Sequence, residues 1–65
     1  MKFFITTDNG HIEDYSGERE YFFSIESATN FVQDNHSDWC GEESQTYFIG
    51  TDNGVVWKTL KTITL

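Results

Sequence analysis

FFITTDNG at residues 3–10 recurs as YFIGTDNG at residues 47–54, and the two stretches are identical at six of eight positions. Each is a run of β-prone residues that ends in Asn-Gly. Asn-Gly between such runs indicates a β-hairpin, because a type I′ turn needs positive φ at both central residues and these two residues adopt it at little cost. The repeat predicts two hairpins, with the carboxylates of Asp8 and Asp52 at their turns.

The first hairpin is expected to pair residues 3–7 with residues 11–15, with successive side chains on opposite faces. Ser16-Gly17-Glu18 then predicts a second turn. Residues 19–23 are either a third short strand or the entry to a helix, and their aromatic run favours the strand.

The second hairpin is expected to pair residues 45–51 with residues 55–60, and this pairing can continue to Leu65. Alternation along these strands predicts one shared face for four apolar side chains, Tyr47, Ile49, Val55 and Trp57. Gly50 stands where the first copy has Thr6. A glycine within a strand pattern predicts a bulge or the close approach of another backbone or ring.

A helix is predicted between the hairpins. Ser24 is a favourable N-cap, and Glu26 suits the positive end of the helix dipole. An apolar stripe with helical spacing follows at Ile25, Ala28, Phe31 and Val32. We expect the helix to end near residues 35–36. The expected fold class is α+β, in hairpin–helix–hairpin (ββ(β)αββ) order, with one helix on one face of four or five antiparallel strands.

The length of 65 residues predicts one core and therefore a single domain over residues 1–65. One cysteine excludes an internal disulfide. The first ten residues do not resemble a signal peptide, and no apolar run approaches the roughly 20 residues of a membrane-spanning helix. These features predict a cytoplasmic protein without a membrane association.

The charge is unevenly distributed along the sequence. All 11 carboxylates lie between Asp8 and Asp52, where Arg19 is the only Lys or Arg, so this stretch carries a formal charge of −10. Direct binding of nucleic acid requires the opposite sign, because its affinity depends on Lys and Arg that neutralise phosphates. The composition therefore argues against a direct nucleic-acid binder.

Residues 34–40 contain the potential metal ligands Asp34, His36, Asp38 and Cys40 at alternate positions. All four share one predicted polar loop, whereas zinc sites normally combine two separated ligand pairs. We favour a solvated loop in which Trp39 packs on the core, with no metal and no cofactor. Cys40 with His36 could also form a nucleophile–base pair, but no orienting residue or oxyanion element accompanies it, so no catalytic residue is predicted.

The 11 aromatic residues exceed what one helix and one sheet face would bury, so some are expected on the surface. Phe3, Phe22 or Phe23, Phe31, Tyr47 and Trp57 are the expected core aromatics, which leaves others as interface anchors. Acidic surfaces steer a protein onto basic partners, although acidity also serves solubility alone. The predicted partner-binding residues are Glu13, Asp14, Tyr15, Glu18, Glu20, Tyr21, Asp38, Trp39, Glu42 and Glu43.

In its small size, high acidity and hairpin–helix–hairpin order the chain resembles the inhibitory proteins of bacteriophages and mobile elements, of the anti-CRISPR or anti-restriction type. That resemblance carries no diagnostic motif, so it assigns no individual residue. It implies a non-enzymatic inhibitor of a basic, nucleic-acid-binding host protein, such as a CRISPR effector, a restriction enzyme or RNA polymerase. The alternative is a homodimer or larger assembly, suggested by the strand-like ending Thr62-Ile63-Thr64-Leu65.

Overall fold

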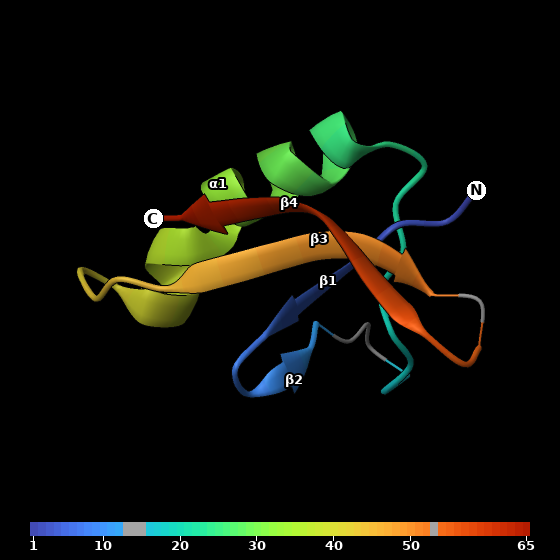
Figure 1. Cartoon of the computed structure of the whole chain (residues 1–65). Helices are drawn as coiled ribbons and strands as arrows, with labels where there is room; N and C mark the ends of the chain where they lie inside the picture. Colours follow the sequence, from blue (N-terminus) through green and yellow to red (C-terminus); the bar gives the residue numbers. More distant parts are fainter. Residues whose placement is uncertain (13–15, 53) are drawn as a thin grey trace.

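A computed structural model describes residues 1–12, 16–52 and 54–65. Their elements, in chain order, are β1 (Phe4–Thr7), β2 (Gly10–His11), α1 (Ile25–Cys40), β3 (Thr46–Asp52) and β4 (Trp57–Thr64). The strands form one antiparallel sheet in the order β2-β1-β3-β4, with α1 on one side of it (Figure 1). The predicted α+β class and the ββαββ order are confirmed.

The two copies of the repeat pair with each other at the centre of the sheet. Ile5 of β1 lies opposite Ile49 of β3, its equivalent in the second copy. On either side, Phe4 pairs with Gly50 and Thr6 pairs with Phe48. The pairing therefore has a local twofold pattern centred on the two isoleucines, and the antiparallel strands send the two turns to opposite ends of the sheet.

The first turn differs from the expected type I′ geometry. Thr7 pairs with Gly10, so Asp8 and Asn9 are the central residues, and positive φ occurs at Gly10 (116°) but not at Asn9. The hydroxyl of Thr7 accepts the Asn9 N–H at 3.2 Å, a local bond that competes with the predicted turn. Pairing continues to Ile12, whose N–H donates to Ile5 O at 3.0 Å. Residues 13–15 of the predicted second strand lie outside the described residues.

The predicted third strand at residues 19–23 is reduced to isolated bridges at Arg19 and Phe22. Phe3 and Phe22 exchange two backbone hydrogen bonds of 2.8 Å, but no regular strand forms. On the side of β1 away from β3, β2 pairs with Thr6 and Thr7, and Phe22 pairs with Phe3. Because two segments share this side, each pairing is short. Phe22 is buried and Phe23 is 79% exposed, so Phe22 is the core residue of this pair. The predicted turn at 16–18 is present, with positive φ at Gly17.

In the second hairpin the pairing begins later than expected. Asp52 pairs with Trp57, so Val55 belongs to the connecting loop and is 89% exposed, and the prediction that it joins the buried face was wrong. A register shift between Ile49 and Gly50 leaves Leu60 without a direct partner. One extra residue in a strand exchanges its two faces.

That bulge changes the predicted position of Trp57. Ile63 lies opposite the buried Tyr47 on the α1 side. Beyond the bulge Trp57 falls on the opposite sheet face, where its ring lies 5.6 Å from that of His11. Trp57 is therefore not the core residue that uninterrupted alternation predicts.

Gly50 is required by the close approach of β4. A Cβ atom at this position would lie 2.1 Å from the carbonyl oxygen of Lys58 and 2.9 Å from the ring of Trp57. Real Cβ contacts are not this short, so another residue would displace the strand. The predicted bulge and the predicted close approach are both confirmed.

The helix begins as predicted. Ser24 has extended backbone angles, and its hydroxyl accepts the Ser27 N–H at 3.0 Å. The predicted end near residues 35–36 was wrong, because α1 continues to Cys40 and Gly41 caps it, donating its N–H to Ser37 O at 2.9 Å.

The added turn places Trp39 on the same face of the helix as Phe31 and Asn35, because these three residues are spaced four apart. The Asn35 amide donates to the Phe31 carbonyl at 2.8 Å. Because residues 34–40 are helical, the four potential metal ligands in this stretch do not share one face, since alternate residues of a helix point in different directions. Among the described residues, no three His, Cys, Asp or Glu side chains lie close enough together to hold one metal ion.

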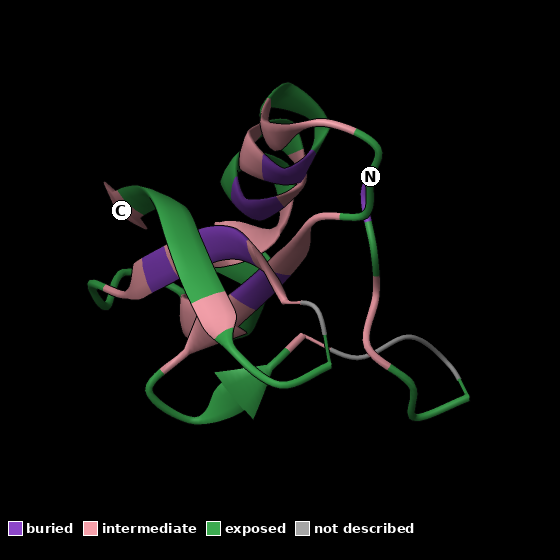
Figure 2. Cartoon of the chain, turned by 45° about the vertical axis from the view of Figure 1, so that its right-hand side comes forward, coloured by how far each residue is buried: buried purple, intermediate pink, exposed green. Residues whose placement is uncertain are grey.

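The core lies between α1 and the centre of the sheet, where α1 packs chiefly on β3 (Figure 2). It is formed by Ile5, Phe22, Ala28, Val32, Tyr47 and Ile49. β4 is largely exposed, and Phe4 and Phe48 on the sheet face away from α1 are half-buried. Within the described ranges, α1 is too short and too polar to cross a membrane.

Candidate functional site

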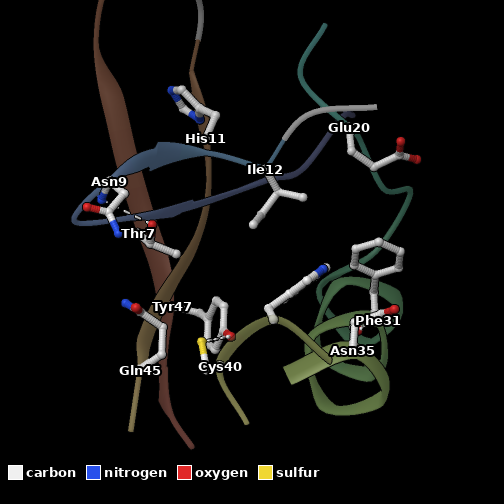
Figure 3. Close-up of a pocket in the computed structure, with 11 residues that line it drawn as sticks. Thr7, Asn9, His11, Ile12, Glu20, Phe31, Asn35, Cys40, Gln45 and Tyr47 are labelled. Carbon is white, nitrogen blue, oxygen red and sulfur yellow. Dashed lines mark hydrogen bonds between the residues drawn. The ribbon is translucent and has the colours of Figure 1, made fainter. Parts of the chain in front are cut away.

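A groove of about 800 Å³ opens between the C-terminal half of α1 and the first hairpin (Figure 3). It exists because α1 packs over β3 and leaves the side of the sheet nearer to β1 and β2 less covered. We call it the α1 groove. The lining residues used below are Glu20, Phe31, Asn35, Trp39, Gln45 and Tyr47.

Three aromatic rings form one wall of the α1 groove. The Trp39 ring lies 5.6 Å from that of Phe31 and 6.2 Å from that of Tyr47, with interplanar angles of 52° and 49°. Tyr47 is buried, whereas Trp39 is 42% exposed. Two ordered rings therefore support an indole that remains accessible to solvent.

Tyr47 is held by polar contacts at its hydroxyl. This group hydrogen-bonds His36 Nδ1 at 2.9 Å and contacts Cys40 Sγ at 3.8 Å. Burial, and to a smaller extent the neighbouring Cys40 thiol, raise the pKa of Tyr47 to about 12. The phenol therefore stays protonated at neutral pH, and its contacts fix the aromatic wall to α1.

The helix end beside the groove carries negative charge. Asp38 lies in the last turn of α1, Glu42 and Glu43 follow it, and the last turn contains no basic residue. We call these three exposed residues the acidic end of α1. The C-terminus of a helix already carries a partial negative charge, so acids there are electrostatically unfavourable. Among the described residues, no Lys or Arg lines the adjoining α1 groove.

A second hollow, of about 590 Å³, gathers three of the four Lys and Arg residues: Lys2, Arg19 and Lys58. Arg19 forms an ion pair with Asp52, and its guanidinium lies 4.1 Å from the centre of the Phe4 ring. The Arg19 hydrogen bond and the Gly54 N–H hold the pKa of Asp52 below its usual value. The carboxylate that was predicted at the second turn is therefore paired with Arg19.

The predicted partner-binding residues divide into separate groups. Glu20 and Trp39 line the α1 groove, and Asp38, Glu42 and Glu43 form the acidic end beside it. The remaining residues fall elsewhere: Glu18 is exposed on a turn, Tyr21 packs against Phe23 and Lys2, and Glu13, Asp14 and Tyr15 lie outside the described residues.

Sequence reasoning missed Phe31, Asn35 and Tyr47 as groove residues. The signal that identifies the first two is the four-residue spacing of Phe31, Asn35 and Trp39, together with Gly41 two residues after Trp39 as a helix stop. Tyr47 was predicted as core, and it is core as well as groove wall.

No protein-family model matches this chain, and no curated protein or solved structure is detectably similar to it.

Proposed function

We propose that this chain is a non-enzymatic acidic binding protein that docks the α1 groove and the acidic end of α1 onto a basic surface of another protein. The observation that carries the proposal is the position of Trp39. This accessible indole, held between two ordered rings, opens into a groove without a lining Lys or Arg in the described residues, next to three exposed acids. Tryptophan is enriched among the residues that dominate binding energy.

The electrostatics of the helix end support a cationic partner. Asp38, Glu42 and Glu43 are placed where the helix dipole makes them unfavourable, and a basic surface would relieve this repulsion. The formal net charge of −7 would also steer the chain toward such a surface and raise the association rate. The acids serve binding at some expense of the stability of the free chain.

The charge supports one class of partner. Proteins that hold nucleic acid present grooves rich in Lys and Arg, and an acidic chain that occupies such a groove excludes the nucleic acid. We therefore propose a cytoplasmic inhibitor or modulator of a host CRISPR effector, restriction enzyme or RNA polymerase, as in the phage and mobile-element inhibitors that the chain resembles.

The test compares two sets of charge reversals. Immobilised wild-type chain should capture a nucleic-acid-binding protein from host lysate at low salt, release it at high salt, and inhibit nucleic-acid binding by the purified partner. D38K/E42K/E43K should lose capture and inhibition. D8K/E18K/E26K, with the same change in charge at other exposed positions, should retain most of both. Equal loss in the two triple variants, or capture that salt does not weaken, would contradict docking through the α1 groove.

A second candidate function is self-assembly through β4. This strand of eight residues, Trp57–Thr64, is at the edge of the sheet, and Leu60 on it is 42% exposed. Edge strands offer backbone groups to another chain, although Lys58 and Lys61 are residues of the kind that oppose such pairing. Sedimentation should find a dimer at high concentration if this surface is used, and a monomer would remove this candidate.

A further inference from the structure

The accessible ring of the α1 groove is suited to a planar cation. Trp39 contacts Phe31 and Tyr47 at angles near 50°, so neither neighbour is stacked parallel to its face. The ring is also ordered in advance, because its supporting residues come from α1 itself and from the core of β3. Tryptophan is the best aromatic partner for a cation, and pre-ordering lowers the entropy lost on binding.

Two polar side chains of the groove, Glu20 and Asn35, offer acceptor oxygens to a cation. Glu20 is half-buried and lines the groove, and its backbone is held beside the groove because its N–H donates to Ile12 O at 2.9 Å. Asn35 donates one amide N–H to the Phe31 carbonyl, and its side-chain oxygen is the acceptor that it can offer a ligand. In Figure 3, Glu20 and Phe31 lie at the same end of the groove, and Tyr47 and Cys40 lie at the other.

We infer that the α1 groove binds the side chain of one arginine from the basic partner, with the guanidinium stacked on Trp39 and paired with the Glu20 carboxylate. This inference rests on the proposed function and specifies its contact. A guanidinium is planar, weakly hydrated, and able to stack on a ring while it donates two hydrogen bonds to a carboxylate. A lysine ammonium is more strongly hydrated and lacks the planar fork. The groove of about 800 Å³ also has room for backbone on either side of the arginine.

The first test titrates the whole chain with blocked Gly-Arg-Gly and follows the two indole N–H signals by NMR. Trp57, on the opposite face of the sheet, is an internal control. We expect the Trp39 signal to shift and the Trp57 signal to stay. The peptide with citrulline, which has nearly the shape of arginine without its charge, should bind about tenfold more weakly, and the lysine peptide should bind roughly threefold more weakly. Equal titration by arginine and citrulline peptides, or equal shifts at both tryptophans, would overturn the inference.

The second test uses matched variants. Glu20→Gln and Trp39→Leu should each weaken arginine-peptide binding about tenfold. Glu26→Gln and Phe23→Leu are the controls, because they change an exposed carboxylate and an exposed ring outside the groove. These should bind like wild type. Glu20 is not part of the buried core, so Glu20→Gln keeps the test decisive if Trp39→Leu folds poorly.

The same variants separate this inference from the proposed function. If D38K/E42K/E43K loses partner capture while Glu20→Gln and Trp39→Leu retain it, the chain docks by general charge and the arginine site is wrong. If no groove or acidic-end variant changes capture, the proposed function itself fails. Loss of arginine-peptide binding together with loss of capture supports both.

Discussion

The two copies of the repeat are nearly identical in sequence and pair with each other, yet they end in different turns. In the first copy Thr7 pairs directly with Gly10, and Asp8 is exposed. In the second copy Asp52 pairs with Trp57 across a longer connection, is only partly exposed, and forms an ion pair with Arg19. A shared Thr-Asp-Asn-Gly sequence therefore specifies that the chain turns, whereas the neighbouring strands determine how it turns.

The main local cause of the difference is the exchange of Thr6 for Gly50. The position of Gly50 lets β4 approach to a distance that any side chain would block, and the bulge at the same place realigns the strand. At the equivalent position of the first copy, Thr6 keeps its side chain and pairs with His11 of β2, which is only two residues long. Three pairs of matched variants test this difference between the two copies.

The largest loss of stability is expected when Gly50 is replaced by the threonine that the first copy has at the equivalent position. Gly50→Thr should cost about 3 kcal/mol or more, because the new side chain overlaps the Lys58 carbonyl and the Trp57 ring. This is a large part of the roughly 3–10 kcal/mol expected for a chain of this length. The reciprocal Thr6→Gly should cost only about 0.5–1 kcal/mol. Urea unfolding of both variants measures the asymmetry, and equal losses would refute the role given to the close approach of β4.

A smaller and symmetric effect is expected at the last residue of each copy. Gly10 and Gly54 both have positive φ, 116° and 90°, and open space where a Cβ would lie. Gly10→Ala and Gly54→Ala should each cost roughly 1–2 kcal/mol through backbone strain alone. Thermal unfolding would check this, and a loss at one position only would mean that the two turns differ in strain as well as in length.

The smallest effect concerns the two turn carboxylates and depends on pH. The pKa of Asp52 is lowered in the folded chain, so its ion pair adds stability above about pH 3.8 that is lost as the pH falls below that value. Asp52→Asn should lower the urea midpoint at pH 7. The difference from wild type should shrink below pH 3.8, as wild-type Asp52 becomes protonated. Asp8→Asn should change the midpoint little at either pH, and an equal effect at the two positions would contradict the difference in their environments.

The candidate site was only partly predictable, for reasons visible in α1. The sequence predicted Ser24 as the N-cap and the apolar stripe from Ile25 to Val32, because these signals involve residues within one or two turns of the helix. The polar run from residue 33 to 38 hid the last turn of the helix, residues 36–40, in which Trp39 contacts Phe31. Trp39 and Glu20 were predicted as binding residues, but their meeting in one groove depends on where α1 crosses the sheet.

Local signals along the chain specify the element order, the helix start, the special role of Gly50 and the excess of acid, because each depends on a residue and its near neighbours. Tertiary contacts set the pairing of the two copies, the face of Trp57, the end of α1, the ion pair of Asp52 and the α1 groove. Each of these depends on contacts between segments far apart in sequence, and the position of one bulge or one crossing helix decides which side chains such segments bring together.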